Sequence, residues 1–387
     1  MLTVDGDCCS GVFATRTTVG NSDGCRFLYV VGQLRAGGLE RQLFYLLQAM
    51  DRRRYNPAVF VWNYTESDVY VARIRALGVP VWSFAGLHGG SRAKLREFRR
   101  VVRQVSPEVL HSYSFYTNLA AHWAAWASNT VPMGSVRSDF LGDKKESGPW
   151  LGRLSARWPR HQIFNSAHAS RQAVRVGGLF IPKTMHVVRN GIDLEVFRYS
   201  PVQTPEPPLL LGIGTLIETK RWDRLIKLAA RFKKEGHHFK LKIIGAGLLR
   251  DALCQLVSDL QIEDHVVLPG QLDDVSAELR QATCLVHPSE VEGCPNVIME
   301  AMASGRAVVA VDSGDVTALV EHGKTGYVVA PEDDAALARY VTLLLTNPDL
   351  SRKMGEAARE KANREFGMDR LVRETLAAYR AAGWKDE

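Results

Sequence analysis

One stretch, residues 282–305, constrains the fold of this chain more than any other. It reads ATCLVHPSEVEGCPNVIMEAMASG: an apolar run, a polar turn, a short helical pattern and a final glycine. A short apolar run that ends in turn residues is typical of a buried parallel strand. Pro295 fits the first position of the helix, and Gly305 fits the residue just beyond its end. A second apolar run, 307–311, follows, so the stretch predicts a strand–helix–strand unit.

The helix of this unit carries an acid in an apolar setting. Its residues are apolar almost all round, which is typical of a buried helix, yet Glu300 lies one turn inside it. A buried carboxylate needs hydrogen-bond partners from the protein or from a ligand. Glu292 lies in the preceding turn, and the helix start between the two acids attracts phosphate through its free N–H groups and its dipole. A nucleotide sugar would match this order, with sugar hydroxyls at Glu292, diphosphate over the helix start and ribose at Glu300.

The spacing of the two acids alone also fits a core helix with a capped glutamate and a second glutamate in a loop. The full run EGCPNVIMEAMASG is more specific. It resembles the E-x7-E signature of the retaining glycosyltransferases of family 4, which have the GT-B fold. The resemblance implies an α/β protein with two Rossmann-like, doubly wound parallel-sheet domains facing a cleft. It also implies transfer of a sugar from a nucleotide-sugar donor to a glycan or lipid-linked acceptor, in cell-surface polysaccharide synthesis.

The rest of the chain alternates between apolar runs and helical patterns, which predicts parallel sheets with right-handed crossovers. Residues 198–208 contain four prolines and no periodicity, as in a linker. We therefore predict five segments: a disordered leader, an acceptor domain, a linker, a donor domain, and a C-terminal helix with the option of packing back on the first domain. Their ranges are 1–25, 26–198, 199–208, 209–365 and 366–387. The strands are expected at 26–34, 58–62, 79–84, 109–113, 134–137, 162–165, 186–188, 209–213, 240–244, 266–268, 282–286 and 307–311.

Glycine turns follow three of the predicted strands, at Gly37-Gly38, at Gly212-Ile213-Gly214-Thr215 and at Gly245-Ala246-Gly247. Glycine lets a backbone approach a ligand closely, although a tight turn explains Gly37-Gly38 equally well. The Gly-x-Gly at 245–247 would also fit a nicotinamide-cofactor fingerprint, but that pattern is incomplete because Arg250 stands at its third glycine position. In the family resemblance these turns and the base-packing loop around Leu268 contact the donor. The implied donor contacts are Gly38, Gly214, Thr215, Gly245, Leu268, Gly293, Cys294, Asn296, Val297 and Glu300. The implied catalytic residues are Glu292, which holds the donor sugar, and Lys220, which stabilises the leaving diphosphate.

The chain departs from the family pattern at three positions. Thr215 stands where an arginine is usual, Asp315 replaces a glycine, and Ala318 replaces a glutamate. Without the arginine one cation is missing at the phosphates, and we expect Arg221 or Arg224 as its substitute. The departures also leave open a catalytically impaired nucleotide-sugar-binding scaffold, and a GT-B-type epimerase or phosphorylase would use the same cleft.

Two residues of the first half are candidates for the acceptor side, His111 and Arg137, because each lies at or near the end of a predicted strand. Many family members place a histidine near the position that Arg137 occupies here, close to the sugar and the acceptor. A lone histidine is more often a hydrogen-bonded core residue. Arg137 could bind an acidic acceptor or a donor phosphate.

The formal net charge of +7 indicates a basic face. Residues 143–160 interleave Lys and Arg with Trp150, Leu151, Leu154 and Trp158, a mixture typical of a surface that touches an anionic membrane. No nucleic-acid-binding module is recognisable. The sequence shows no signal peptide and no apolar run of spanning length. We therefore expect a cytoplasmic protein, which could also associate peripherally with the inner face of the membrane.

We expect neither a metal nor a cofactor. The six cysteines show no zinc-ligand spacing, and the Asp-x-Asp run, Asp5-Gly6-Asp7, lies in the leader. We read the cysteines as reduced thiols.

Overall fold

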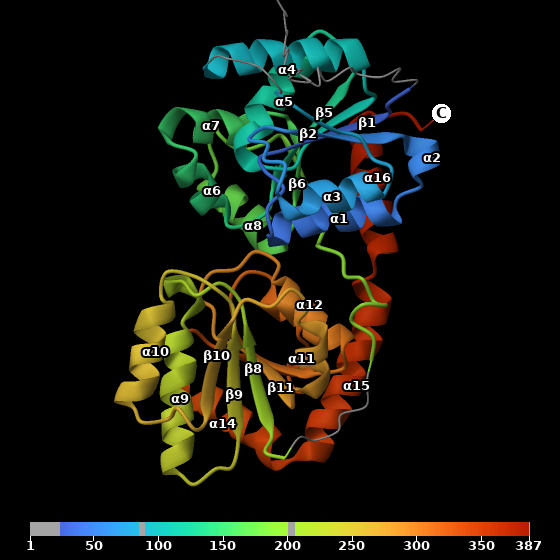
Figure 1. Cartoon of the computed structure of the whole chain (residues 1–387). Helices are drawn as coiled ribbons and strands as arrows, with labels where there is room; N and C mark the ends of the chain where they lie inside the picture. Colours follow the sequence, from blue (N-terminus) through green and yellow to red (C-terminus); the bar gives the residue numbers. More distant parts are fainter. Residues whose placement is uncertain (1–23, 85–89, 200–205, 387) are drawn as a thin grey trace, which may run out of the picture.

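The computed structural model describes residues 24–84, 90–199 and 206–386, which form two domains with a sheet in each (Figure 1). The predicted leader lies outside the described residues, except for its last two. One of these, Cys25, is buried beside the first strand, where its Sγ donates to the carbonyl of Phe27 at 3.4 Å. Residues 5–7 and the pair Cys8-Cys9 also lie outside the described ranges. Of the described helices, none has both the length and the hydrophobicity of a membrane span.

The first domain contains a seven-stranded parallel sheet in the order β3-β2-β1-β4-β5-β6-β7. Each of its strands was expected from an apolar run, and the ends shift by at most a few residues. The strands are β1 (Phe27–Val31), β2 (Pro57–Val61), β3 (Val81–Ser83), β4 (Val109–Ser112), β5 (Val131–Val136), β6 (His161–Phe164) and β7 (Thr184–Val187). Its helices are α1 (Gly38–Ala49), α2 (Arg52–Tyr55), α3 (Val69–Ala76), α4 (Ser91–Val105), η1 (Phe115–Thr117), α5 (Asn118–Ala125), α6 (Phe140–Glu146), α7 (Pro149–Arg157) and α8 (Ala167–Val176).

The second domain contains a six-stranded parallel sheet in the order β10-β9-β8-β11-β12-β13. The sequence predicted five of these strands. Their bounds are β8 (Leu209–Ile213), β9 (Lys240–Ile244), β10 (Val266–Gly270), β11 (Cys284–His287) and β12 (Ala307–Val311). The sixth strand, β13 (Gly326–Val329), pairs with β12 and was not predicted. The helices of this domain are η2 (Glu218–Lys220), α9 (Trp222–Lys234), α10 (Arg250–Asp259), α11 (Ser276–Gln281), α12 (Asn296–Ala303), α13 (Val316–Leu319), α14 (Asp334–Thr346) and α15 (Pro348–Glu365). The helix that follows them, α16 (Met368–Ala381), packs on the first domain.

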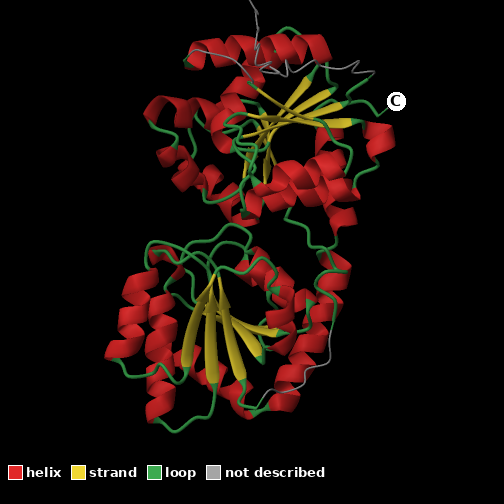
Figure 2. Cartoon of the chain, in the orientation of Figure 1, coloured by secondary structure: helices red, strands yellow, loops and turns green. Residues whose placement is uncertain are grey.

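Helices cover both faces of each sheet (Figure 2). This explains why the central strands are continuous apolar runs rather than alternating ones. Every residue of β1, β2 and β12 is buried. Because parallel strands end at the same edge, the turns after them gather where the two domains face each other, which is where open α/β sheets bind ligands.

The end of the chain returns to the first domain. In Figure 1 the red helix α15 runs along the second domain, and α16 continues upward against α1. Tyr379 of α16 is fully buried in the core of the first domain, and its ring meets Phe27 of β1 edge-on at 5.3 Å. Trp384 packs in the same core and donates from its indole N–H to Glu108 at 2.6 Å.

The strand–helix–strand unit predicted from residues 282–311 corresponds to β11, α12 and β12. The prediction for Pro295 is off by one position: its ψ of 108° is extended, so it caps the helix and Asn296 is the first helical residue. Gly305 lies just beyond the helix with φ of +74°, the left-handed conformation that favours glycine.

Candidate functional site

A cavity of about 540 Å³ opens between the domains at the carboxyl ends of β8, β9 and β11. The first domain contributes Ala36, Gly38 and Arg41, and the second domain contributes the remaining walls. Most of the predicted donor and catalytic residues meet here. They are Gly38, Gly214, Thr215, Lys220, Gly245, Glu292, Cys294, Asn296, Val297 and Glu300.

Two predicted donor contacts lie elsewhere. Leu268 is not among the residues that line this cavity; it lies within β10 and packs half-buried against the core of the second domain. The strand runs two residues further than predicted and bulges between Val267 and Gly270. The wall beyond it is therefore formed by Gln271, Leu272 and Val275, which the sequence did not single out. The other contact, Gly293, faces a neighbouring cavity.

The glycine turns after β8 and β9 touch each other. A side chain at Gly245 would place its Cβ 1.9 Å from the carbonyl oxygen of Gly214. On the facing domain, a Cβ at Gly38 would lie 3.1 Å from the side-chain nitrogen of Asn296. These glycines let the backbone approach closely, and they keep the cavity wall free of side chains.

Glu292 is held as a carboxylate by two nitrogen donors. Lys220 Nζ lies 2.5 Å from its Oε1, and His287 Nε2 donates to the same oxygen at 2.8 Å. Burial works against ionisation, but the charges and hydrogen bonds of His287 and Lys220 outweigh it and lower the pKa of Glu292 to about 2. His287 ends β11 and was not predicted as a site residue. Its position at the carboxyl end of a central strand was the signal for it.

Glu300 is 2% exposed and forms an ion pair with Arg41, which α1 carries across from the first domain. Burial raises the pKa of Glu300, and the charge of Arg41 opposes that rise. Arg41 therefore lies where the sequence placed the ribose, and it also lines the donor-side cavity. Arg41 follows the predicted glycine turn Gly37-Gly38 by three residues, but the sequence did not single it out.

The two arginines expected to replace a missing phosphate cation do not do so. Arg221 pairs with Glu290 and Asp223, and Arg224 pairs with Asp334 at 2.7 Å. Neither is among the residues that line the cavity. Arg41 and Lys220 bring positive charge to it instead.

A second cavity of about 480 Å³ adjoins the first and reaches into the first domain. The two share Gly38, Lys220, Glu292, Cys294 and Asn296 in their walls. Arg137, one of the two residues predicted for the acceptor side, lines the second cavity. His111 does not line either one: its two ring nitrogens are hydrogen-bonded to Tyr379 at 2.7 Å and to Ser135 at 2.8 Å, and burial followed by the charge of Arg137 lowers its pKa. The structure thus gives His111 the core role that was the alternative for it.

Two family models divide the chain between them. The model described as Glycosyltransferase Family 4 matches residues 36–196, and the model described as Glycosyl transferases group 1 matches residues 196–361. The chain belongs to glycosyltransferase family 4. Its fold agrees with that membership, since the GT-B protein HepE of Anabaena, solved in complex with UDP, superposes with a TM-score of 0.78 at 18% identity, covering 92% of this chain and 100% of that one.

Two relatives illustrate the sequence similarity of this glycosyltransferase. The alpha-maltose-1-phosphate synthase of Mycobacterium tuberculosis is 28% identical over 311 residues, 70% of this chain and 78% of the relative. The N-acetyl-alpha-D-glucosaminyl L-malate synthase of Bacillus anthracis is 30% identical over 171 residues, 44% of this chain and 45% of the relative. Both similarities are those of distant members of one family.

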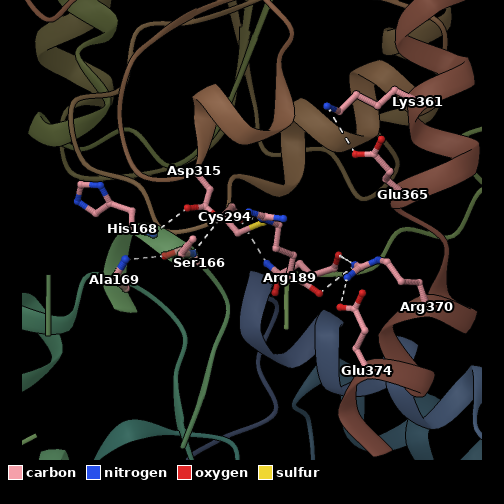
Figure 3. A network of polar contacts seen from close by, with 12 residues as sticks. Ser166, His168, Ala169, Arg189, Cys294, Asp315, Lys361, Glu365, Arg370 and Glu374 are labelled. Carbon is pink, nitrogen blue, oxygen red and sulfur yellow. Dashed lines mark hydrogen bonds and ion pairs between the residues drawn. The ribbon is translucent and has the colours of Figure 1, made fainter. Parts of the chain in front are cut away.

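The unusual Asp315 of this glycosyltransferase joins its two domains, as Figure 3 shows. Its carboxylate accepts hydrogen bonds from the backbone N–H groups of Ala167 and His168, at 2.9 and 2.8 Å, and from Arg189 Nε at 2.8 Å. The two N–H groups belong to the first turn of α8, which Ser166 caps in addition. Asp315 therefore satisfies helix-end donors of the opposite domain rather than lining the donor cavity.

The preceding residue, Gly314, needs to be a glycine for a steric reason. It has φ of +57°, and a Cβ there would lie 2.4 Å from the carbonyl oxygen of Glu292. Ala318 does not line the donor cavity or the second one.

Replacing Asp315 with alanine is expected to lower the free energy of unfolding by about 2–4 kcal/mol, because three hydrogen bonds to a buried carboxylate are lost. Urea unfolding followed by circular dichroism would measure this change. Asp312→Asn removes a neighbouring exposed carboxylate and should change stability by less than about 0.5 kcal/mol. Equal stability of the two variants would show that the contacts of Asp315 contribute nothing.

Proposed function

We propose that this glycosyltransferase transfers a sugar from a nucleotide-sugar donor to a hydroxylated acceptor with retention of anomeric configuration and without a metal. One observation carries the proposal: two acids and two cations line a single interdomain cavity beside the start of α12. That combination matches the hydroxyls and the diphosphate of a nucleotide sugar.

The donor would lie along α12. Asn296 and Val297 bring the helix start, with its N–H groups and positive dipole end, to the cavity wall, where a diphosphate is favoured. Lys220 and Arg41 add positive charge there. In this arrangement Arg41 takes the role of the arginine that Thr215 replaces, and it shares Glu300 with the ribose hydroxyls.

Catalysis would be mainly electrostatic. When the bond to the sugar breaks, negative charge grows on the leaving diphosphate, and cations already in place stabilise it without reorganisation. Glu292 is kept ionised by Lys220 and His287, so it can accept hydrogen bonds from sugar hydroxyls but does not supply a proton. Since the two cavities meet at Glu292, an acceptor in the second cavity would approach the sugar from the side on which the diphosphate leaves, which is the geometry of retention.

The decisive experiment is incubation with a panel of UDP-, GDP- and ADP-sugars, with and without EDTA, followed by detection of nucleoside diphosphate. HepE was solved with UDP, so UDP-sugars are tested first. Release that resists EDTA supports the proposal, and the coupling constant of the anomeric proton in the product reports retention. Sugar conversion without release would indicate an epimerase. Binding without turnover would indicate a scaffold.

We propose further that the enzyme works at the cytoplasmic side of a membrane, on a glycan or lipid-linked acceptor. Its first domain exposes large apolar side chains on and near α7: Trp150 is 74% exposed and Trp126 is 65% exposed. Leu151 and Leu154 are also exposed. Arginines of the same region lie over aromatic rings, as Arg157 and Arg160 do over Trp158. Aromatic and basic groups together favour the interface of an anionic bilayer.

The change Trp150→Glu should lower binding to phosphatidylglycerol vesicles about tenfold, since burying a large apolar side chain contributes about 1.5–3 kcal/mol. Vesicle sedimentation at low and high salt measures the bound fraction, and salt should weaken the binding of the unchanged protein. Leu248→Glu alters a side chain of the second domain that is 96% exposed and serves as the control. If both variants bind like the unchanged protein, α7 is not a membrane contact.

A further inference from the structure

Arg137 carries a buried charge for which the described residues provide no partner. It follows β5 and lines both the second cavity and an adjoining one of about 610 Å³. Its three guanidinium nitrogens are inaccessible to solvent and form no hydrogen bond with the residues that the structure describes. The guanidinium carbon lies 4.0 Å from the ring centre of Tyr113. The stacking fixes the plane of the group.

The acids near Arg137 are engaged elsewhere or exposed. Asp139 accepts from the backbone N–H of Gly142 at 2.6 Å and caps α6. Asp143 accepts from the hydroxyl of Ser138 at 2.7 Å. Glu146 is exposed at the cavity rim. A buried guanidinium with five donors and no counter-ion is costly in a finished structure, so a residue kept in this state points to a missing anionic partner.

Two amide oxygens without partners line the same cavity. The side-chain nitrogen of Asn165 donates to the carbonyl of Arg137 at 2.7 Å, and that of Asn190 donates to the side-chain oxygen of Asn296 at 2.8 Å. These bonds set the orientation of each amide, and their buried Oδ1 atoms then have no donor among the described residues. The cavity thus offers cationic donors beside neutral acceptors, which suits a ligand with both an anionic group and hydroxyls.

We propose that Arg137 is the specificity-determining residue for an acceptor that carries a carboxylate or phosphate next to its hydroxyls. This rests on the proposed function, since it assigns the second cavity to the acceptor. Arg137 is absent from the walls of the donor cavity, where Lys220 and Arg41 serve the diphosphate. The second cavity, in contrast, reaches Glu292 and Gly293, beside which the donor sugar would lie.

The test compares four acceptors in the presence of the donor sugar that gives turnover: glucose, glucose 1-phosphate, glucuronate and phosphatidylinositol in vesicles. We expect at least one anionic acceptor to have a KM about tenfold or more below that of glucose. Arg137→Gln should raise the KM for that acceptor about 10–100-fold and leave the affinity for the nucleoside diphosphate unchanged. Arg137→Lys should retain part of the preference. The control is Arg175→Gln, which removes the same charge from an exposed position on α8 and should change neither value.

The comparison of the four acceptors also distinguishes a soluble anionic acceptor from a lipid headgroup. Preference for the soluble compounds indicates a sugar phosphate or sugar acid, and preference for the vesicles indicates a lipid headgroup. Equal KM values for glucose and all anionic acceptors, or an unchanged preference in Arg137→Gln, would overturn the assignment.

The thermal stability of Arg137→Gln distinguishes a purely structural role of Arg137 from a role in acceptor binding. Because the substitution removes an unpaired buried charge, Arg137→Gln should unfold at the same or a higher temperature, whereas a lower temperature together with unchanged acceptor preference would assign it to the fold alone. If no nucleotide sugar is turned over, the proposed function fails. Calorimetric titration of the unchanged protein and Arg137→Gln with glucose 1-phosphate and glucuronate then still decides whether this site binds anions.

Discussion

Replacing Lys220 with alanine should lower kcat about 10²–10³-fold, the loss that follows removal of one preplaced group that stabilises developing charge. Lys220 ends the short turn η2 and reaches Glu292 at 2.5 Å, in the wall shared by both cavities. The effect should fall on kcat more than on the donor KM, because the charge on the leaving group is greatest in the transition state.

The fold should tolerate this change. Glu292 keeps its hydrogen bond from His287, so we expect a stability loss of only about 1–2 kcal/mol. Lys227→Ala is the matched control: this lysine lies on the following helix, is 62% exposed and pairs with Asp223. Steady-state release of nucleoside diphosphate measures both variants. A Lys220→Ala enzyme with normal kcat would remove Lys220 from the catalytic mechanism.

Replacing Arg41 with methionine should lower the free energy of unfolding by about 3–5 kcal/mol at pH 8, because it leaves the buried carboxylate of Glu300 without its partner. Burial already raises the pKa of Glu300, and Arg41 opposes the rise. Without Arg41 the pKa should rise further. A group whose folded pKa lies above its unfolded value of 4.5 favours folding at low pH, so the deficit should shrink as the pH falls toward that value.

A double-mutant cycle separates the ion pair from other effects of Arg41. The variant Arg41→Met/Glu300→Gln carries no unpaired charge and should recover most of the lost stability. Urea unfolding at pH 8 and pH 5 provides the numbers. Because the pair joins the two domains, part of the cost can appear as an open cleft, which small-angle scattering would detect as a larger radius of gyration. Equal losses at both pH values in the single mutant would contradict the role given to Glu300.

The sequence was most informative where apolar runs alternate with turn residues. Central strands such as β1 and β12 are buried on both faces, so their composition alone reveals them. The strand β13 escaped prediction because it is short and begins with Gly326. The same logic located most of the donor cavity, since turns after parallel strands meet at one edge of a sheet.

The sequence was least informative about contacts between distant segments. Arg41 and Glu300 are 259 positions apart, and only the docking of the two domains makes them partners. Asp315 departs from the family pattern, and its role becomes visible only in the structure, where it caps a helix of the other domain. His111 lies not in the site but in the core, where it is hydrogen-bonded to Tyr379, a residue of the distant helix α16. No local pattern encodes such pairings.

That last helix has a consequence for biosynthesis. Translation proceeds from the amino to the carboxyl end, yet the hydrophobic core around Phe27 is completed by Tyr379 and Trp384. The first half of the polypeptide therefore keeps part of that core uncovered until α16 and Trp384 have been synthesised and have left the ribosome. Premature termination before α16 would harm the half of the protein that was made first.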